Sequence, residues 1–161
     1  MLAALDLRLL RLLRTRGHWP PFERAVRRYA MAGENGLLWH GIAAAGVALH
    51  GTRRPVYVRA MRITVVTLVA NVAVKRIVRR ARPVLEEELP HLVPTLSGRS
   101  YPSAHSSTSF AAAGALADAL PAPPLYAAAA AMALSRPYLG VHYPSDVVAG
   151  ALLGRAVERL M

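Results

Sequence analysis

Three short clusters of cationic, hydroxyl and imidazole side chains carry the chemistry available to this sequence. The first is KRIVRRARP (Lys75–Pro83), the second is YPSAHSSTS (Tyr101–Ser109) and the third is SRPYLGVHYPSD (Ser135–Asp146). Guanidinium and ammonium groups neutralise phosphate oxygens, and an imidazole can attack an electrophile or move a proton. The residue types therefore indicate chemistry on a phosphorylated substrate.

The first cluster places cations on one face of a helix end. Lys75, Arg79 and Arg82 recur at near-helical spacing, so several positive charges would face the same way. Such a face suits phosphate, although interfacial arginines also close membrane helices without any ligand. This cluster alone leaves both interpretations open.

The second cluster begins a helix with a serine and a histidine. Ser103 either caps that helix or joins its unpaired N–H groups in holding an anion. His105 follows within the same turn, where it could give a proton to a leaving oxygen.

The third cluster combines a fixed cation with a histidine and a carboxylate. Arg136 is a forked donor matched to phosphate, and Gly140 allows backbone to approach a ligand closely. Asp146 stands four residues after His142. It could fix the tautomer of that imidazole and leave the other nitrogen free to attack, or form a purely structural hydrogen bond.

Five apolar segments are predicted to form the helices that position these clusters. They cover approximately residues 37–49, 59–79, 105–120, 125–138 and 145–161. Each reaches the roughly 20 residues of a spanning helix only with its polar ends, and their many Ala and Gly residues suit close packing in a membrane. We expect an all-α bundle of about five spanning helices, with a soluble helical bundle as the alternative. The order of the helices places all three clusters on one side.

The first 32 residues are predicted to form an amphipathic segment ahead of the bundle at 36–161, all within one domain over 1–161. Its leucines and arginines fall on different faces, which fits an interfacial helix with arginines towards lipid phosphates, or a helix packed on protein. The leucine face holds Leu2, Leu5, Leu9, Leu12 and Leu13, and the other holds Arg8, Arg11 and Arg14. The long loop at 82–102 contains an acidic run, Glu86–Glu88, which we interpret as a solvated loop face.

Composition narrows the classes of partner. The 161 residues are 54% hydrophobic, carry a formal charge of +11 and include no cysteine. Nucleic acid is disfavoured because aromatics are only 6% and the basic residues lie between apolar runs. Without cysteine the chain forms neither disulfides nor thiolate metal sites. The remaining partners are anionic lipids and phosphate groups.

Taken together, the three clusters resemble the type 2 phosphatidic acid phosphatase family, which shares its active site with bacterial acid phosphatases and vanadium haloperoxidases. The matching patterns are K-x6-R-P from Lys75, P-S-x-H from Pro102, and S-R-x5-H-x3-D from Ser135 with the usual Gly140. They cover nearly half of the chain, in order and complete. GENGLLW, before the first spanning helix, is a weaker resemblance.

The resemblance implies a role for each matching residue. His142, oriented by Asp146, attacks phosphorus, and His105 protonates the leaving alkoxide and then activates water. The phosphate is held by Lys75, Arg82, Ser103, Arg136 and the backbone near Gly140. No carboxylate cluster suggests a metal site, so we expect neither metal nor cofactor. A vanadate-dependent haloperoxidase and a non-catalytic membrane scaffold or lipid-binding subunit are the alternatives.

The expected substrate is a lipid phosphate in the cell membrane. Similarity to small actinobacterial enzymes of polyprenyl-phosphate pathways implies decaprenylphosphoryl-5-phosphoribose, with undecaprenyl pyrophosphate, phosphatidylglycerophosphate and phosphatidic acid as alternatives. Of the 20 Lys and Arg residues, 14 fall on the side of the three clusters and six on the other. The positive-inside rule then places the site towards the cytoplasm. Faces rich in Ala and Gly leave open whether helices pack within one chain or in a homo-oligomer.

Overall fold

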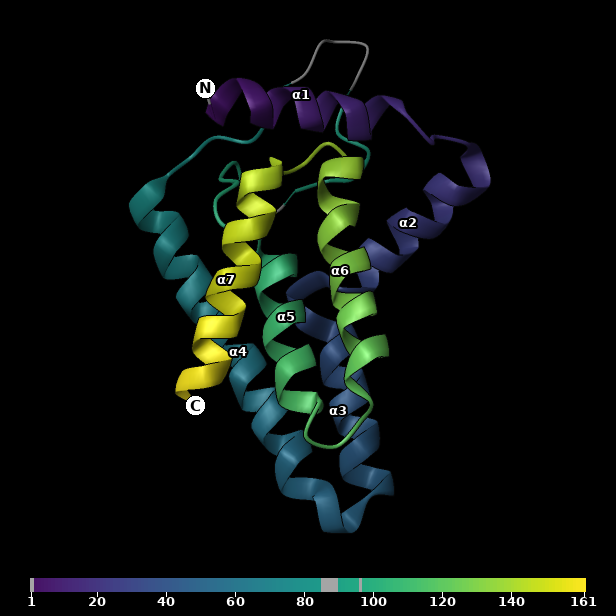
Figure 1. Ribbon diagram of the computed structural model, residues 1–161, viewed down its shortest axis with the longest axis vertical. Coiled ribbons are helices and arrows are strands. Elements are labelled where there is room, and N and C mark those ends of the chain that lie inside the picture. Colours follow the sequence, from purple (N-terminus) through teal and green to yellow (C-terminus); the bar gives the residue numbers. More distant parts are fainter. Residues whose placement is uncertain (1, 85–89, 96) are drawn as a thin grey trace.

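Helices make up most of the chain in the computed structural model, which describes residues 2–84, 90–95 and 97–161. In order they are α1 (Leu2–Thr15), α2 (Pro20–Ala32), α3 (Leu37–Leu49), α4 (Arg54–Val78), α5 (Ala104–Leu116), α6 (Ala122–Tyr138) and α7 (Pro144–Leu160), with single 3₁₀ turns at Glu34–Gly36 and Gly51–Arg53 (Figure 1). Within these ranges the β structure is limited to an isolated antiparallel bridge between Ala81 and Arg99. The prediction of an all-α fold is confirmed.

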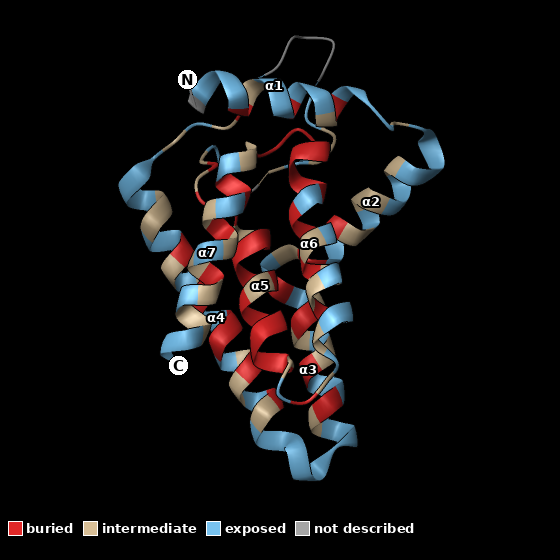
Figure 2. Ribbon diagram, viewed as in Figure 1, coloured by how far each residue is buried: buried red, intermediate tan, exposed pale blue. Residues whose placement is uncertain are grey.

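The central element is α5, which lies among α4, α6 and α7 and is buried along nearly its whole length (Figure 2). Its sequence is mostly Ala, Ser, Thr and Gly, and these small side chains let neighbouring helices come close. At Gly154 of α7, an added Cβ would overlap the carbonyl oxygen of Ser107. The α7 backbone therefore rests directly on the first turns of α5, where His105 lies.

Buried hydrogen bonds fix the rotation of α5. The side-chain amide of Asn71, on α4, donates to the Ser107 hydroxyl at 2.8 Å and to the Pro102 carbonyl oxygen at 3.2 Å. The indole N–H of Trp39, on α3, donates to the Ser109 hydroxyl at 2.8 Å. Because an unpaired buried polar group is costly, these bonds favour one orientation of α5.

The amphipathic segment predicted over residues 1–32 forms two helices. Gly17, with a left-handed φ of 72°, interrupts the helical segment, and Pro20 begins α2. The first of them, α1, lies across the end of the bundle where α6 ends and α7 begins (Figure 1). Arg14 is only 7% exposed and donates to the Pro90 carbonyl oxygen at 3.0 Å, whereas Leu5 is 53% exposed. The prediction that these arginines face lipid phosphates is therefore wrong for Arg14, which packs on protein.

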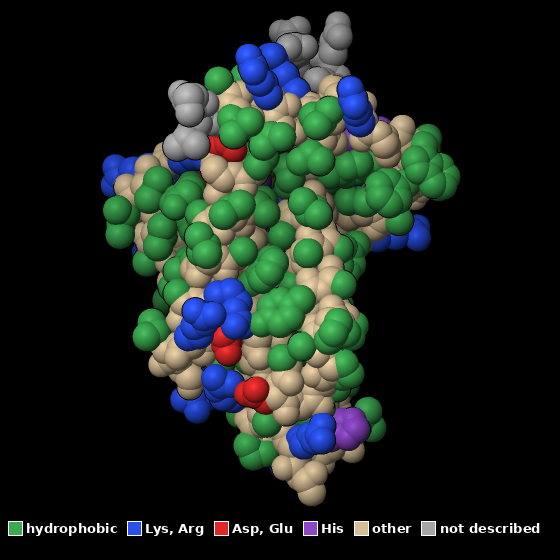
Figure 3. Space-filling view, in the orientation of Figure 1, with side chains coloured by type: hydrophobic (Ala, Val, Ile, Leu, Met, Phe, Trp, Pro, Cys, Tyr) green, Lys and Arg blue, Asp and Glu red, His purple; other side chains and the backbone are tan. Residues whose placement is uncertain are grey.

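None of the described helices is both long enough and apolar enough to cross a bilayer. The helices α3 and α5 have 13 residues each, and α4, with 25, carries arginines in its first turns and Lys75 and Arg76 in its last. These helices do not support the prediction of about five spanning helices. The outer faces of α4 and α7 nevertheless expose large apolar side chains, including Val65, Val69 and Leu152, and Figure 3 shows hydrophobic side chains across one face of the bundle. Glu86–Glu88 lies outside the described residues.

Candidate active site

Five of the eight predicted site residues line one cavity of about 210 Å³ between the ends of α4, α5 and α6. They are Lys75, Arg82, His105, Arg136 and His142. Asp146 lies directly behind His142, whereas Ser103 and Gly140 do not line this cavity. The expectation that three separate clusters meet on one side of the bundle agrees with this geometry.

The three cations reach the cavity from three directions. The Lys75 ammonium donates to the carbonyl oxygens of Arg99 and Ser100, at 3.3 and 3.2 Å. Arg82 is held by the carbonyl oxygens of Ser97 and Val141, each at 2.7 Å.

Arg136 is the most deeply placed of the three. It is only 5% exposed, and its Nε has no hydrogen-bond partner in the part of the chain that the structure describes. Like charges gathered in a buried space are unfavourable until an anion enters. The cavity is therefore built to receive a group with several anionic oxygens.

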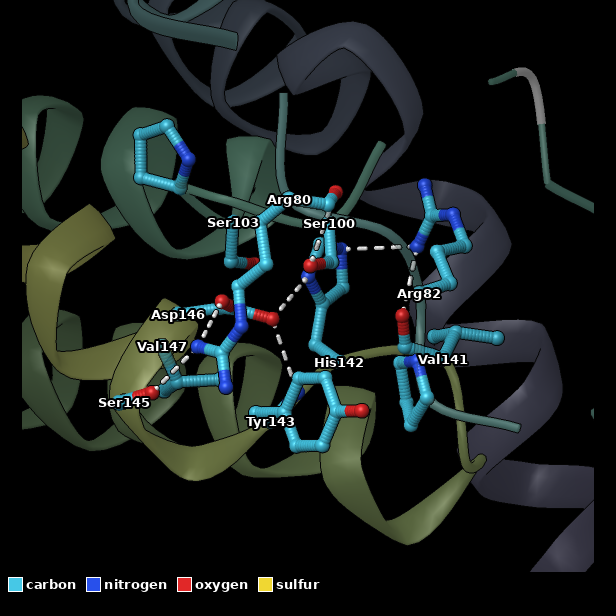
Figure 4. A network of polar contacts seen from close by, with 12 residues as sticks. Arg80, Arg82, Ser100, Ser103, Val141, His142, Tyr143, Ser145, Asp146 and Val147 are labelled. Atoms are coloured by element: carbon cyan, nitrogen blue, oxygen red, sulfur yellow. Dashed lines mark hydrogen bonds and ion pairs between the residues drawn. The ribbon is translucent and has the colours of Figure 1, made fainter. Parts of the chain in front are cut away.

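The two nitrogens of His142 face groups of opposite charge. Nε2 is 3.2 Å from Nη1 of Arg82, and Nδ1 is 3.5 Å from Oδ2 of Asp146 (Figure 4). A guanidinium only donates, so the nitrogen that faces it must carry a lone pair. This assigns the proton to Nδ1, on the side of Asp146, and leaves the lone pair on Nε2.

The environment of His142 also keeps the imidazole neutral. The side chain is 2% exposed, and burial lowers its pKa well below the ordinary value. Repulsion from Arg82, Arg136 and Lys75 lowers this pKa further. A neutral imidazole is the form that can attack phosphorus.

His105 contributes the second imidazole from the first turn of α5. Its Nε2 lies 3.0 Å from the Ala30 carbonyl oxygen and 3.7 Å from a carboxylate oxygen of Glu34. Because a carbonyl only accepts, Nε2 of His105 must carry a proton. That proton is donated to the Ala30 carbonyl oxygen, so a proton for a leaving group would be carried on Nδ1 of His105. A lone pair on one histidine and a second histidine that can carry a proton suit nucleophilic attack followed by protonation of a leaving group.

Ser103 and Gly140 have clear structural roles. The Ser103 hydroxyl caps α5 by accepting a hydrogen bond from the Ser106 backbone N–H at 3.4 Å. The backbone N–H of Ser103 donates to the Asp146 carbonyl oxygen at 2.9 Å. Gly140 adopts a φ of 80° that favours glycine, and its N–H donates to Pro137. Direct phosphate binding by either residue stays a prediction.

Several residues near the cavity escaped sequence reasoning. Glu34, Asn35 and Asn71 line the cavity, and Arg80 donates to Asp146 at 2.8 Å. GENGLLW was noticed only as a weaker family resemblance, with no role for Glu34 or Asn35, and Arg80 stands in a basic run whose members look alike. A positive φ of 49° at Asn35, unusual for a residue other than glycine, marks this turn as constrained. Among the described residues, no group of three or more His, Asp or Glu could hold a metal ion.

Comparison with known proteins gives the same assignment. Residues 56–161 match the sequence model of the PAP2 superfamily. The chain is 39% identical over 127 residues to a decaprenylphosphoryl-5-phosphoribose phosphatase of Mycolicibacterium smegmatis, covering 78% of this chain and 69% of that protein. It is 40% identical over 143 residues to the protein of the same name from Mycobacterium tuberculosis, covering 88% and 80%.

Two solved structures share the fold. Aquifex aeolicus LpxE aligns with a TM-score of 0.77 at 25% identity, covering 97% of this chain and 93% of that one. A transmembrane PAP2 type phosphatidylglycerolphosphate phosphatase from Bacillus subtilis aligns with a TM-score of 0.78 at 22% identity, covering 99% and 83%. The family model and the two mycobacterial phosphatases favour an enzyme over a non-catalytic scaffold. Because the matched region contains all three clusters, the chain belongs to the PAP2 superfamily and is a phosphatase.

Proposed function

We propose that this phosphatase hydrolyses a membrane lipid phosphate through a phosphohistidine on His142. The observation that carries the proposal is the single cavity that three cations and two histidines line together. Nε2 of His142 attacks phosphorus, the bond from phosphorus to the alkoxide breaks, and His105, protonated on both ring nitrogens for this step, gives the alkoxide its proton. Water then loses a proton to His105 and attacks phosphorus, which releases phosphate and restores His142.

In both steps the cations hold the phosphoryl oxygens. Phosphoryl transfer depends mainly on positioning and on neutralising charge, which Lys75, Arg82 and Arg136 supply. We therefore expect turnover without a metal ion.

The proposed substrate is decaprenylphosphoryl-5-phosphoribose, the compound after which the mycobacterial relatives are named. A lipid substrate is supported by an apolar groove of about 420 Å³ between α1, α2 and α6. Phe22, Tyr29 and Leu134 line this groove, and Ser135, beside Arg136, reaches it as well. A lipid chain in the groove could therefore extend from a phosphate in the cavity.

We also propose that the bundle sits in the cell membrane as a multi-pass protein with its active site towards the cytoplasm. The apolar outer faces of α4 and α7 support contact with lipid. A bilayer can thin around helices shorter than its hydrocarbon core. The excess of Lys and Arg on the side of the site supports the orientation.

The test is phosphate release by the protein purified in detergent. We expect the highest kcat/KM for decaprenylphosphoryl-5-phosphoribose, compared with undecaprenyl pyrophosphate, phosphatidylglycerophosphate and phosphatidic acid. His142→Ala should reduce kcat by about 10³-fold or more, and excess chelator should leave turnover unchanged. Wild-type rates in His142→Ala would place the nucleophile elsewhere. Loss of turnover in chelator that magnesium restores would contradict a metal-free reaction.

A further inference from the structure

We propose that Arg80 and Asp6 are positioning residues for the His142–Asp146 pair, so that the N-terminal helix α1 supports catalysis through a chain of alternating charges. The inference rests on the proposed role of His142 as the nucleophile. It extends the three motif clusters to α1, an element that lies outside all of them.

Arg80 is held on several sides in a fixed geometry. Its Nη1 donates to Oδ1 of Asp146 at 2.8 Å and to the Ser145 hydroxyl at 2.7 Å (Figure 4). Its Nη2 donates to Oδ2 of Asp6 at 2.8 Å. The guanidinium carbon also lies 4.0 Å from the centre of the Tyr143 ring. One guanidinium thus joins a carboxylate of α1 to the carboxylate behind His142.

Asp6 fastens α1 to the first turn of α7. One of its oxygens accepts the Ser145 backbone N–H at 2.9 Å, and the other accepts the Ser145 hydroxyl as well as Arg80. The residue is only 8% exposed, so these bonds are largely shielded from water. Since Ser145 immediately precedes Asp146, this carboxylate sets the position of the helix start that carries Asp146.

This network matters because the contact between Asp146 and His142 is loose. Nδ1 of His142 is 3.5 Å from Oδ2 of Asp146 and has no hydrogen-bond partner in the described residues. The same Oδ2 already accepts the Tyr143 N–H at 2.9 Å. The orientation of the imidazole therefore depends on where its surroundings hold the carboxylate.

The ion pair between Arg80 and Asp146 also indicates that Arg80 supports the His142–Asp146 pair. Asp146 has no exposed surface, and Arg80 is the cation that hydrogen-bonds its carboxylate. Removing one partner of a buried ion pair leaves an uncompensated charge, which favours the protonated acid. A protonated Asp146 would support the positive charge that develops on His142 less well.

The neighbouring arginines provide a matched control. Arg79 precedes Arg80 in the same basic run but, unlike Lys75 and Arg82, does not line the cavity; it is exposed and donates through Nε to the Arg76 carbonyl oxygen. Arg79→Gln therefore removes the same charge one residue away without touching Asp146. For Asp6, the matched control is Asp118→Asn, because that side chain is 63% exposed and pairs with Arg59 on α4.

The experiment compares kcat, KM and thermal stability in detergent for Arg80→Gln, Arg80→Lys, Asp6→Asn, both controls and His142→Ala. We expect Arg80→Gln to lower kcat by about 10- to 100-fold with KM changed by less than about 3-fold, as for the loss of a charged hydrogen bond. Asp6→Asn should lower kcat by about 3- to 10-fold, because Asp6 acts one step further away. Arg80→Lys should recover part of the loss, and both controls should match the wild type.

Two further arms separate positioning from general destabilisation. In an Asp146→Asn background, Arg80→Gln should change kcat by less than about 2-fold, since residues that act as one unit are not additive. A full additional loss in that background would overturn the inference, as would wild-type kcat for Arg80→Gln. A loss of kcat that only follows the folded fraction of the variant would also overturn it. If His142→Ala still turns over, the proposed function fails instead.

Discussion

At the scale of single residues, the two ring nitrogens of His142 meet different demands. Nε2 must keep a lone pair although it faces Arg82, and Nδ1 must keep a proton that faces Asp146. Both demands require a neutral ring in a place surrounded by positive charge. Burial, together with repulsion between the nearby cations and a protonated ring, therefore keeps His142 in the form that its proposed role requires.

The lowered pKa of His142 predicts a stability that depends on pH. The unfolded chain exposes this imidazole, whose pKa returns to about 6.5. Below that pH the unfolded state binds a proton that the folded state excludes, so the free energy of unfolding falls, by up to about 1.4 kcal/mol per pH unit. We expect the Tm of the wild type, in detergent without phosphate, to drop more between pH 7 and pH 5 than the Tm of His142→Gln. Equal drops would show that the ring is not held neutral.

Residue type and spacing predicted most of the site, but not every partner within it. Lys75, Arg82 and Arg136 could be singled out because they fall in the patterns K-x6-R-P and S-R-x5-H-x3-D. Arg80 could not, because neighbouring arginines in one run have the same chemistry in the sequence. Only the packing of α1 against α7 makes Arg80 different from Arg79.

At the scale of elements, the helix boundaries follow the apolar segments and the positions of the prolines. The first apolar segment was predicted over residues 37–49 and matches α3. Pro55 favours a helix start, and α4 begins at Arg54, five residues before the predicted boundary. Pro121 disfavours helical backbone in the residue before it, and α5 ends at Leu116 rather than near residue 120. The break at Gly17 was missed because residues 1–32 were treated as one amphipathic segment.

Replacing glycine by alanine should have opposite effects on stability at Gly154, in the contact between α5 and α7, and at Gly41, on the open face of α3. A Cβ at Gly154 would overlap the Ser107 carbonyl oxygen, which is backbone and cannot move aside easily. Gly154→Ala should therefore destabilise the protein by about 1–3 kcal/mol or more, as overpacking does. Gly41 on α3 has open space around it, so Gly41→Ala should be neutral or stabilising by up to about 1 kcal/mol. Thermal unfolding of both variants checks this, and equal effects would contradict the close packing.

At the scale of the whole molecule, the antiparallel order of the helices gathers the chemistry. Because α4 and α6 end where α5 and α7 begin, residues far apart in the sequence meet around one cavity (Figure 1). This gathering was predictable, since it follows from counting helices between clusters. The placement of α1 across that end was not, because its exposed leucines and buried Asp6 depend on what lies beneath it.

The same arrangement makes the orientation in the membrane testable. Helix α7 begins beside the site and runs away from it, so the C-terminus marks the opposite end of the bundle (Figure 1). With 14 of 20 Lys and Arg residues on the side of the site, the positive-inside rule predicts a cytoplasmic site and an extracytoplasmic C-terminus. A reporter that is active only outside the cytoplasm should give signal when fused after Met161, whereas a cytoplasmic reporter should not. The matched fusion before Met1 should give the reverse pattern. A cytoplasmic signal at the C-terminus would reverse the orientation and place the cavity on the outer face.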